Sequence, residues 1–353
     1  EFVGVPGFSA DEAAYTSLAL DGNNTPYVAY RDGEYNGKAT VKKFNGTSWE
    51  PVGTEGFSAG DVQDISLALD GNGIPYVAYI DVENEYKATV MKFNGTNWET
   101  VGTAGFSTGM ADYTSLAFDG TGTPYLAYTD IMTGIKVNVM KFNGTSWINV
   151  GAAGLSAGAA HYTSLAFDPI GTPYVAYVDQ WYAGKITVKR FNGTNWESVG
   201  AEGFGSIITQ FLSIKIDESG NPFVAFRDSN IGDKASVMKF NGTNWETVGA
   251  PGLSAGVASF ISLALNGSGT PYVAYTDGNK TDDATVMKFN GSNWETVGTA
   301  GFTEGDASSF SLAIDTNGTP YLAFVDDEAG DGATVMKFIS GDASGGDGNY
   351  TYE

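Results

Sequence analysis

One spacing runs through almost the whole chain: six tryptophans follow one another at intervals of 49 residues, without an insertion or deletion between them. They are Trp49, Trp98, Trp147, Trp196, Trp245 and Trp294. A series of serines keeps the same interval and opens segments such as SLALD, SLAFD and SLAID. These are Ser17, Ser66, Ser115, Ser164, Ser213, Ser262 and Ser311. A fixed period of this length indicates an array of repeated supersecondary units.

Each repeat has the composition of four short strands. In the first copy we expect them at 15–21, 26–32, 39–44 and 49–53, each rich in β-branched and aromatic residues. Turn sequences separate them, such as Asp21-Gly22-Asn23-Asn24 and the strong hairpin signal Asn45-Gly46. Seven four-stranded antiparallel meanders with a 49-residue repeat predict an all-β, seven-bladed β-propeller.

The two ends of the chain predict how the ring closes. The seventh copy stops before its tryptophan and fourth strand, whereas residues 1–4 lie 49 positions before residues 50–53. We therefore expect the N-terminal strand to complete the last blade, which removes an open sheet edge. The expected blades are 15–53, 64–102, 113–151, 162–200, 211–249, 260–298, and 309–340 together with 1–4. The Gly/Asp-rich tail 341–353 reads as a linker, so we expect the 1–340 propeller to be one module of a larger multidomain protein.

The repeat also carries a resemblance. The runs TPYVAY at 25–30 and KATVMKFNGTNW at 87–98 resemble the propeller repeats of secreted and cell-surface proteins of bacteria and archaea. The resemblance covers nearly the whole chain. It implies an extracellular or cell-surface location, with adhesion and glycan binding as the functions to expect.

Charge and composition restrict the partners. The formal net charge of -23 repels nucleic acid and anionic lipid. No apolar run reaches the length of about 18 residues that a membrane helix needs, so we expect no membrane insertion. With one histidine, no cysteine and no Gly-x-Ser-x-Gly motif, the chain lacks a recognisable catalytic constellation. We therefore expect a binding protein and not an enzyme.

Comparison of the seven copies locates the candidate binding site. Two segments vary strongly: the loop after the second strand, and the position held by Ala14, Gln63, Asp112, His161, Gln210, Ser259 and Ser308. In an up-and-down blade both segments lie on one face, and loops on a rigid scaffold commonly carry function. The variable face offers stacking rings, hydrogen-bonding groups and a cation. The predicted ligand-binding residues are Trp181, Tyr182, His161, Gln210 and Arg227.

These residues suit a glycan, because aromatic rings stack on sugars while polar groups bond hydroxyls. We therefore expect a carbohydrate-binding or adhesive module whose partner is a glycan. A protein-interaction scaffold that binds a surface protein is the alternative, and a polysaccharide-active hydrolase or lyase is the third interpretation.

Acidic residues raise the question of calcium. An aspartate ends the second strand of every copy, and it either forms a sevenfold cation site or caps local backbone N–H groups; recurrence in all copies favours capping. These are Asp32, Asp81, Asp130, Asp179, Asp228, Asp277 and Asp326. The candidate Ca²⁺ ligands in the last blade are Asp326, Asp327, Glu328 and Asp331, which lack the ordered spacing of an EF-hand. No other cofactor is expected.

Overall fold

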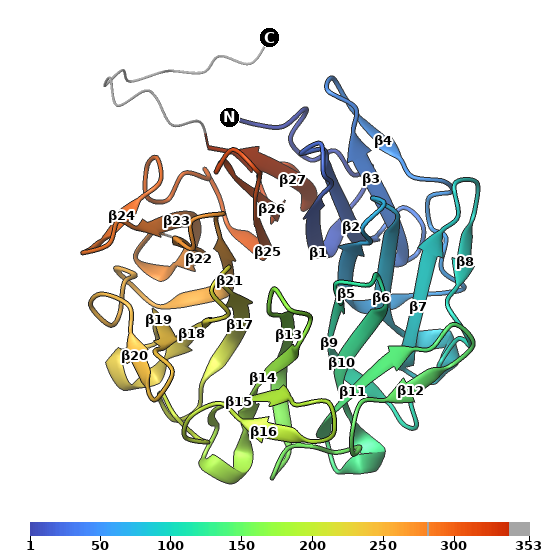
Figure 1. Ribbon diagram of the computed structural model, residues 1–353. Helices are drawn as coiled ribbons and strands as arrows, with labels where there is room; N and C mark the ends of the chain where they lie inside the picture. The colour runs from blue at the N-terminus through green and yellow to red at the C-terminus, as the bar shows by residue number, and fades with distance from the viewer. Residues whose placement is uncertain (281, 339–353) are drawn as a thin grey trace.

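The structure is a computed structural model that describes residues 1–280 and 282–338. Over these residues the strands form seven antiparallel sheets around a central axis (Figure 1). Six sheets contain four strands in sequence order, and the seventh contains β25, β26 and β27. The predicted seven-bladed β-propeller is confirmed. The segment 341–353, expected to be a linker, lies outside the described residues.

Each blade runs from the axis to the rim. The innermost strands are β1 (Ala13–Leu20), β5 (Val62–Leu69), β9 (Ala111–Phe118), β13 (Ala160–Phe167), β17 (Gln210–Ile216), β21 (Ala258–Leu265) and β25 (Ala307–Ile314). The second strands are β2 (Pro26–Asp32), β6 (Pro75–Asp81), β10 (Pro124–Asp130), β14 (Pro173–Asp179), β18 (Pro222–Asp228), β22 (Pro271–Asp277) and β26 (Pro320–Asp326). The third strands are β3 (Lys38–Phe44), β7 (Lys87–Phe93), β11 (Lys136–Phe142), β15 (Lys185–Phe191), β19 (Lys234–Phe240), β23 (Asp283–Phe289) and β27 (Gly332–Lys337). The outer strands are β4 (Trp49–Pro51), β8 (Trp98–Thr100), β12 (Trp147–Asn149), β16 (Trp196–Ser198), β20 (Trp245–Thr247) and β24 (Trp294–Thr296).

The second strand of each blade is the most deeply buried. In β2, the consecutive residues Val28, Ala29 and Tyr30 are all fully buried. Val28 and Tyr30 pack towards the last blade, and Ala29 packs towards the second blade. Both faces of the strand are therefore covered by neighbouring blades, which explains why its sequence is a continuous apolar run.

The two repeated residue series join adjacent blades. The Trp98 indole Nε1 donates to the Val52 carbonyl oxygen at 2.7 Å, and its ring stacks on Phe57 with centroids 4.0 Å apart. Near the axis, the Ser17 hydroxyl oxygen accepts a hydrogen bond of 2.9 Å from the Leu67 backbone N–H. The residues that recur every 49 positions thus form the contacts between blades as well as the structure within each blade.

The N-terminal segment supplies the missing edge of the last blade, as the sequence predicts. The Val3 N–H donates to the Val335 carbonyl at 2.8 Å, and the Lys337 N–H donates to the Glu1 carbonyl at 2.9 Å. Phe2 forms an antiparallel bridge with Met336. Figure 1 shows the blue N-terminal segment beside the red strand β27. The ring is closed by the first residues of the chain.

The two faces of the disc differ. On the face that we call the turn face, short connections are fixed by their own side chains: Asp21 Oδ1 accepts from the N–H groups of Asn23 and Thr25. On the opposite face, which we call the loop face, the longer connections contact one another. The Gly33 N–H, after β2, donates to the Glu12 carbonyl before β1 at 2.8 Å. The two variable segments therefore do meet on one face.

Short 3-10 turns follow the second strand in five of the described loops. They are η1 (Val82–Asn84), η2 (Ile131–Thr133), η3 (Gln180–Tyr182), η4 (Ser229–Ile231) and η5 (Gly278–Lys280). The recurring aspartate caps η2 to η5 but not η1, where the Asp81 side chain makes no cap hydrogen bond. In η3, Asp179 Oδ1 accepts from the N–H groups of Trp181 at 2.9 Å and Gly158 at 3.0 Å. These bonds tie the loop to the preceding connection, so the capping interpretation accounts for this aspartate.

Candidate functional site

A strained ring of residues surrounds the axis near the loop face. Each innermost strand changes register against its partner at a β-bulge close to the strand's first residues. One residue in each bulge has a positive φ: Tyr15 (54°), Asp64 (52°), Tyr113 (53°), Tyr162 (53°), Phe211 (51°), Phe260 (49°) and Ser309 (56°). Left-handed backbone costs a non-glycine residue about 1 kcal/mol or more, and it concentrates at functional sites. The conformation is common to all seven copies, whereas the side chain that it holds differs between them, and this variation makes the ring the leading candidate site.

The ring encloses a hollow of about 310 Å³ at the axis, which we call the funnel. Its lining consists of the seven bulge residues and the residue after each of them, for example Thr16, Thr114 and Thr163. The bulges lie at the starts of the innermost strands, where these strands leave the loop face. The funnel therefore opens among the variable loops.

The lining of the funnel is asymmetric. Four consecutive bulge residues form a chain of rings that we call the aromatic arc: Tyr113, Tyr162, Phe211 and Phe260. The centroids of neighbouring rings lie 4.9, 5.9 and 5.4 Å apart in that order. The remaining bulge residues are Ser309, Tyr15 and Asp64, which carry oxygen atoms. One side of the funnel can therefore stack on an apolar surface while the other forms hydrogen bonds.

Asp64 is the charged member of the ring. Its Oδ2 accepts a hydrogen bond from the Thr114 backbone N–H, and the Thr114 hydroxyl donates to the Asp64 carbonyl. Burial raises the pKa of Asp64 to about 7, opposed by the Thr114 hydrogen bond and reinforced by the nearby charge of Asp112. Partial desolvation of its carboxylate likewise raises the pKa of Asp112, although the residue is exposed as a whole. Asp64 thus places one carboxylate in the lining of the funnel, and Asp112 lies beside the lining residue Tyr113, close enough for its charge to raise the pKa of Asp64.

Three of the five predicted residues lie around the funnel. The His161 ring meets Tyr113 of the aromatic arc edge-on, with centroids 5.7 Å apart at 84°. Gln210 and Arg227 are register partners on β17 and β18. The charge of Arg227 acts on Tyr162, and its buried Nε lies 3.1 Å from Asp233 Oδ1, an ion pair without hydrogen-bond geometry.

The other two predicted residues lie in η3. The Trp181 side chain is 72% exposed. The Tyr182 hydroxyl, by contrast, donates to Glu202 Oε2 at 2.6 Å, and its ring packs against Gly203. Hydrogen bonds from Ser198 and Tyr182 lower the pKa of Glu202 to about 2. Trp181 remains available to a ligand, whereas Tyr182 fastens its loop to the connection between β16 and β17.

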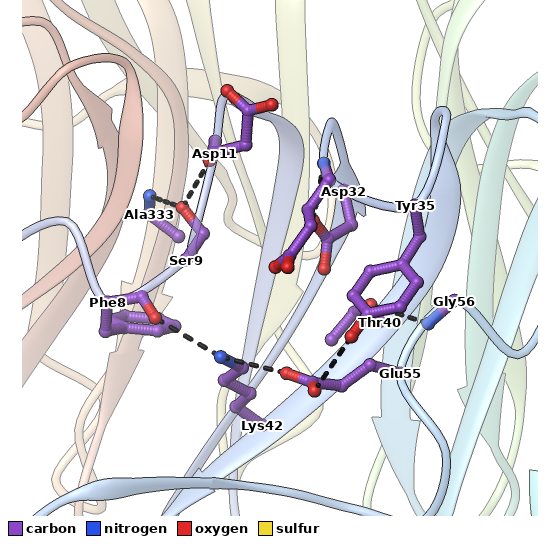
Figure 2. Close-up of polar contacts among 11 residues, drawn as sticks. Phe8, Ser9, Asp11, Asp32, Tyr35, Thr40, Lys42, Glu55, Gly56 and Ala333 are labelled. Atoms are coloured by element: carbon purple, nitrogen blue, oxygen red, sulfur yellow. Dashed lines mark hydrogen bonds and ion pairs between the residues drawn. The ribbon is translucent and has the colours of Figure 1, made fainter.

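The first blade repeats this arrangement. The Tyr35 hydroxyl donates to Glu55 Oε2 at 3.3 Å, and Lys42 Nζ lies 3.0 Å from Glu55 Oε1 (Figure 2). The Thr40 hydroxyl accepts from the Gly56 N–H at 2.9 Å, which fixes the same loop. A tyrosine at this position therefore has a structural role in two blades. Within residues 1–280 and 282–338, no hydrogen bond or ring contact joins Trp181 to His161, Gln210 or Arg227.

Trp181 belongs to a wider exposed apolar region of the third to fifth blades, which we call the apolar sector. Its members are Met110, Ile131, Met132, Trp181, Ile207 and Ile208. Met132 and Trp181 occupy the same repeat position in adjacent blades and are 71% and 72% exposed. The Ile208 N–H donates to the Ala183 carbonyl at 3.1 Å, so Ile208 joins the loop that holds Trp181.

The acidic residues suggested as calcium ligands do not gather. Asp326 Oδ2 accepts from the Thr334 hydroxyl at 3.3 Å, and the Asp326 carbonyl accepts from the Ala329 N–H. In the part of the chain that the structure describes, no group of three or more His, Cys, Asp or Glu residues is placed to hold a metal ion.

A second hollow, of about 490 Å³, lies between the fifth and sixth blades and includes turn-face residues such as Asn290. Its charged groups are paired: Lys288 Nζ lies 3.1 Å from Glu295, and Lys239 Nζ lies over the Phe223 ring at 4.6 Å. Ion pairs equivalent to that of Lys288 recur in other blades. The funnel is smaller, but it combines the aromatic arc, the Asp64 carboxylate and variation between blades. We therefore regard the funnel as the candidate site.

Sequence reasoning identified the variable position beside each bulge but missed the bulge residues themselves. A signal was present, because this position reads Tyr, Asp, Tyr, Tyr, Phe, Phe and Ser in the seven copies. Such variation inside an otherwise uniform strand is what a site residue shows. The left-handed conformation, by contrast, has no local sequence signal, since bulky residues rarely adopt it.

Comparisons with known proteins show the fold. No family model and no curated protein matches the chain. Among solved structures, a polysaccharide lyase, an ulvan lyase bound to a GlcA–Rha3S saccharide, superposes with a TM-score of 0.62 at 14% identity, covering 95% of both chains. The SapL1 lectin in complex with α-methyl fucoside gives 0.58 at 15% identity, covering 83% of this chain and 99% of that one.

The extracellular domain of the one-component system BT4673 from B. thetaiotaomicron gives a TM-score of 0.61 at 12% identity, covering 94% of this chain and 39% of that one. The propeller architecture is thus shared with sugar-binding, sugar-cleaving and extracellular proteins. No helix among the described residues has the length and apolarity needed to cross a membrane.

Proposed function

We propose that this chain is an extracellular carbohydrate-binding module that holds a glycan in the funnel. The observation that carries the proposal is the ring of strained residues, in which an aromatic arc faces oxygen-bearing side chains across a hollow of about 310 Å³. Aromatic rings offer sugars a stacking surface, and Ser309, Tyr15 and Asp64 offer hydrogen bonds to hydroxyl groups. His161, Gln210 and Arg227 extend these polar contacts around the rim.

The neighbours in fold support a carbohydrate ligand. One is a lectin seen with a fucoside, one is a lyase seen with a saccharide, and one is an extracellular domain. At 12–15% identity they share only the fold with this chain, so the glycan itself has to come from experiment.

A glycan array probed with and without calcium provides the first test, and the absence of binding to any glycan would refute the proposal.

The site is tested with two matched variants. Phe260 in the aromatic arc is 37% exposed with a φ of 49°, and Tyr86 outside the funnel is 39% exposed with a φ of 59°. We expect Phe260→Ala to weaken binding about tenfold, equivalent to about 1.4 kcal/mol, and Tyr86→Ala to leave it unchanged. Equal affinities of the two variants for the glycan would show that the glycan does not bind in the funnel.

Trp181→Ala distinguishes the funnel from the rim. If a long glycan leaves the funnel across the apolar sector, this variant weakens binding of long oligosaccharides and leaves short ones unaffected. Unchanged affinity for every length would restrict the site to the funnel.

We further propose that the module binds its glycan without cleaving it, since its one histidine lies edge-on to a ring and no recognisable catalytic constellation surrounds it. Incubation with the array hit, followed by chromatography of the glycan, tests this. Shortened products that are absent with the Phe260→Ala variant would establish an enzyme instead.

A protein-interaction scaffold is the second candidate, and the apolar sector favours it. Met132, Trp181 and Ile208 are exposed apolar residues in the loop-face connections of the third to fifth blades, and exposed apolar surface of this kind marks protein contacts. A surface-protein partner would be recognised by loss of binding in Met132→Ser and Trp181→Ser together, with no effect of Phe260→Ala.

A further inference from the structure

Two carboxylates lie at the funnel: Asp64 lines it, and Asp112 lies beside the lining residue Tyr113. Asp64 and Asp112 come from neighbouring blades, and each accepts a backbone hydrogen bond, from Thr114 and Tyr113 respectively. Among residues 1–280 and 282–338, no lysine or arginine forms an ion pair with either carboxylate. The charge of Asp112 acts on Asp64 and also on Tyr15, Tyr113 and Tyr162, so its field reaches both sides of the funnel.

The positive groups nearby are already compensated. Arg31 Nε lies 2.7 Å from Asp61 Oδ1, and Arg227 Nε lies 3.1 Å from Asp233 Oδ1. His161 is the remaining basic side chain beside Asp112. Each arginine forms an ion pair with an aspartate, so the two pairs add no net positive charge near the funnel. The carboxylates of Asp64 and Asp112 therefore leave an excess of negative charge that a cation would compensate.

The aromatic arc adds a second feature that favours a cation. The rings of Tyr113, Tyr162 and Phe211 lie in the same hollow as Asp64. Aromatic faces attract ammonium groups, and a carboxylate beside them strengthens the attraction. A neutral sugar would use the rings but would leave the two carboxylates without a counter-charge.

We propose that the funnel selects a glycan that carries a protonated amine, that is, an amino sugar whose nitrogen is not acetylated. This inference rests on the proposed glycan-binding function and specifies its ligand class. The ammonium group lies against Asp64 and Asp112, and the sugar ring stacks on the aromatic arc. N-acetylation removes the charge and with it the preference.

The test compares β-1,4-linked glucosamine oligomers with N-acetylglucosamine oligomers of the same length by titration calorimetry. A third probe, the N-trimethylated oligomer, carries a charge that does not depend on pH. We expect both charged oligomers to bind at least tenfold more tightly than the acetylated one at low ionic strength. We expect this preference to fall several-fold in Asp112→Asn and in Asp64→Asn.

Glu218→Gln provides the matched control, because Glu218 is an exposed acid in a turn of the opposite face. It removes the same charge and should leave the preference intact. Asp112 is exposed, so its substitution leaves folding intact even if Asp64→Asn does not.

Equal binding of charged and acetylated oligomers would overturn the inference and leave the glycan-binding function standing. A preference that Glu218→Gln reduces as much as Asp112→Asn would also overturn it, since overall charge would then explain the selectivity. Failure of all three oligomers overturns the inference as well, and the glycan array then decides whether the proposed function falls with it.

Discussion

Substitution of Val3 by aspartate tests whether the N-terminal segment is an integral strand of the last blade. The Val3 side chain is 4% exposed, and its carbonyl accepts a hydrogen bond of 2.7 Å from the Trp49 indole. Loss of the buried valine alone costs about 2 kcal/mol. Burial of a carboxylate costs more free energy than the loss of the valine. The total loss of stability cannot exceed the free energy with which the N-terminal strand is bound, because the strand can detach.

Release of the strand would also break the backbone bonds that join Val3 to Val335 and Glu1 to Lys337. At about 1 kcal/mol for each hydrogen bond, the upper limit is about 5 kcal/mol. We therefore expect Val3→Asp to lower the free energy of unfolding in urea by about 2–5 kcal/mol.

Val5→Asp is the control, because Val5 is 71% exposed only two residues along the chain. It should change the unfolding free energy by less than about 0.5 kcal/mol. The two midpoints are compared with the slope of the transition held constant. Equal midpoints for the two variants would refute the view that residues 1–3 close the ring.

Three further substitutions test the interior of the propeller and its titrating groups. Trp98→Phe removes the indole donor to the Val52 carbonyl. It should lower the free energy of unfolding in urea by about 1–3 kcal/mol, because a buried carbonyl loses its partner. A smaller effect than that of Val5→Asp would contradict this. The raised pKa of Asp64, about 7, means that the folded state binds more protons than the unfolded state between about pH 4 and 7, so stability falls as pH rises through this window. The difference in unfolding free energy between Asp64→Asn and the wild type should therefore shift in favour of the variant from pH 4 to pH 8, by at most about 4 kcal/mol. Parallel profiles of unfolding free energy against pH for the two proteins would refute this. Tyr182→Phe should raise the pKa of Glu202 from about 2 towards its ordinary value. The stability that the wild type loses as pH falls through this low pKa should then be smaller in the variant. A carboxyl NMR titration shows whether the pKa moves.

The strands and the closed ring could be predicted from the sequence because the same strand and turn residues recur in the seven copies of the repeat. Turn residues such as Asp21 and Asn45 accept the backbone hydrogen bonds that their positions suggested. The N-terminal closure followed because residues 1–4 fit the register of the repeat.

The candidate site was predicted less completely. Variation between blades led to His161, Gln210 and Arg227, which lie near lining residues of the funnel but are not themselves part of its lining. It could not separate Trp181 from Tyr182, since only the fold shows that the Tyr182 hydroxyl reaches Glu202 in the following connection. The aromatic arc was missed because its rings are brought together by left-handed bulges, and a strand pattern predicts extended backbone there.

A crystal structure of the protein with an oligosaccharide identified by the array tests most directly whether the funnel binds a glycan. We expect a sugar ring packed against Tyr113, Tyr162, Phe211 or Phe260, with a polar group directed towards Asp64. A sugar bound between blades in the hollow lined by Lys239 and Lys288, with the funnel empty, would contradict it.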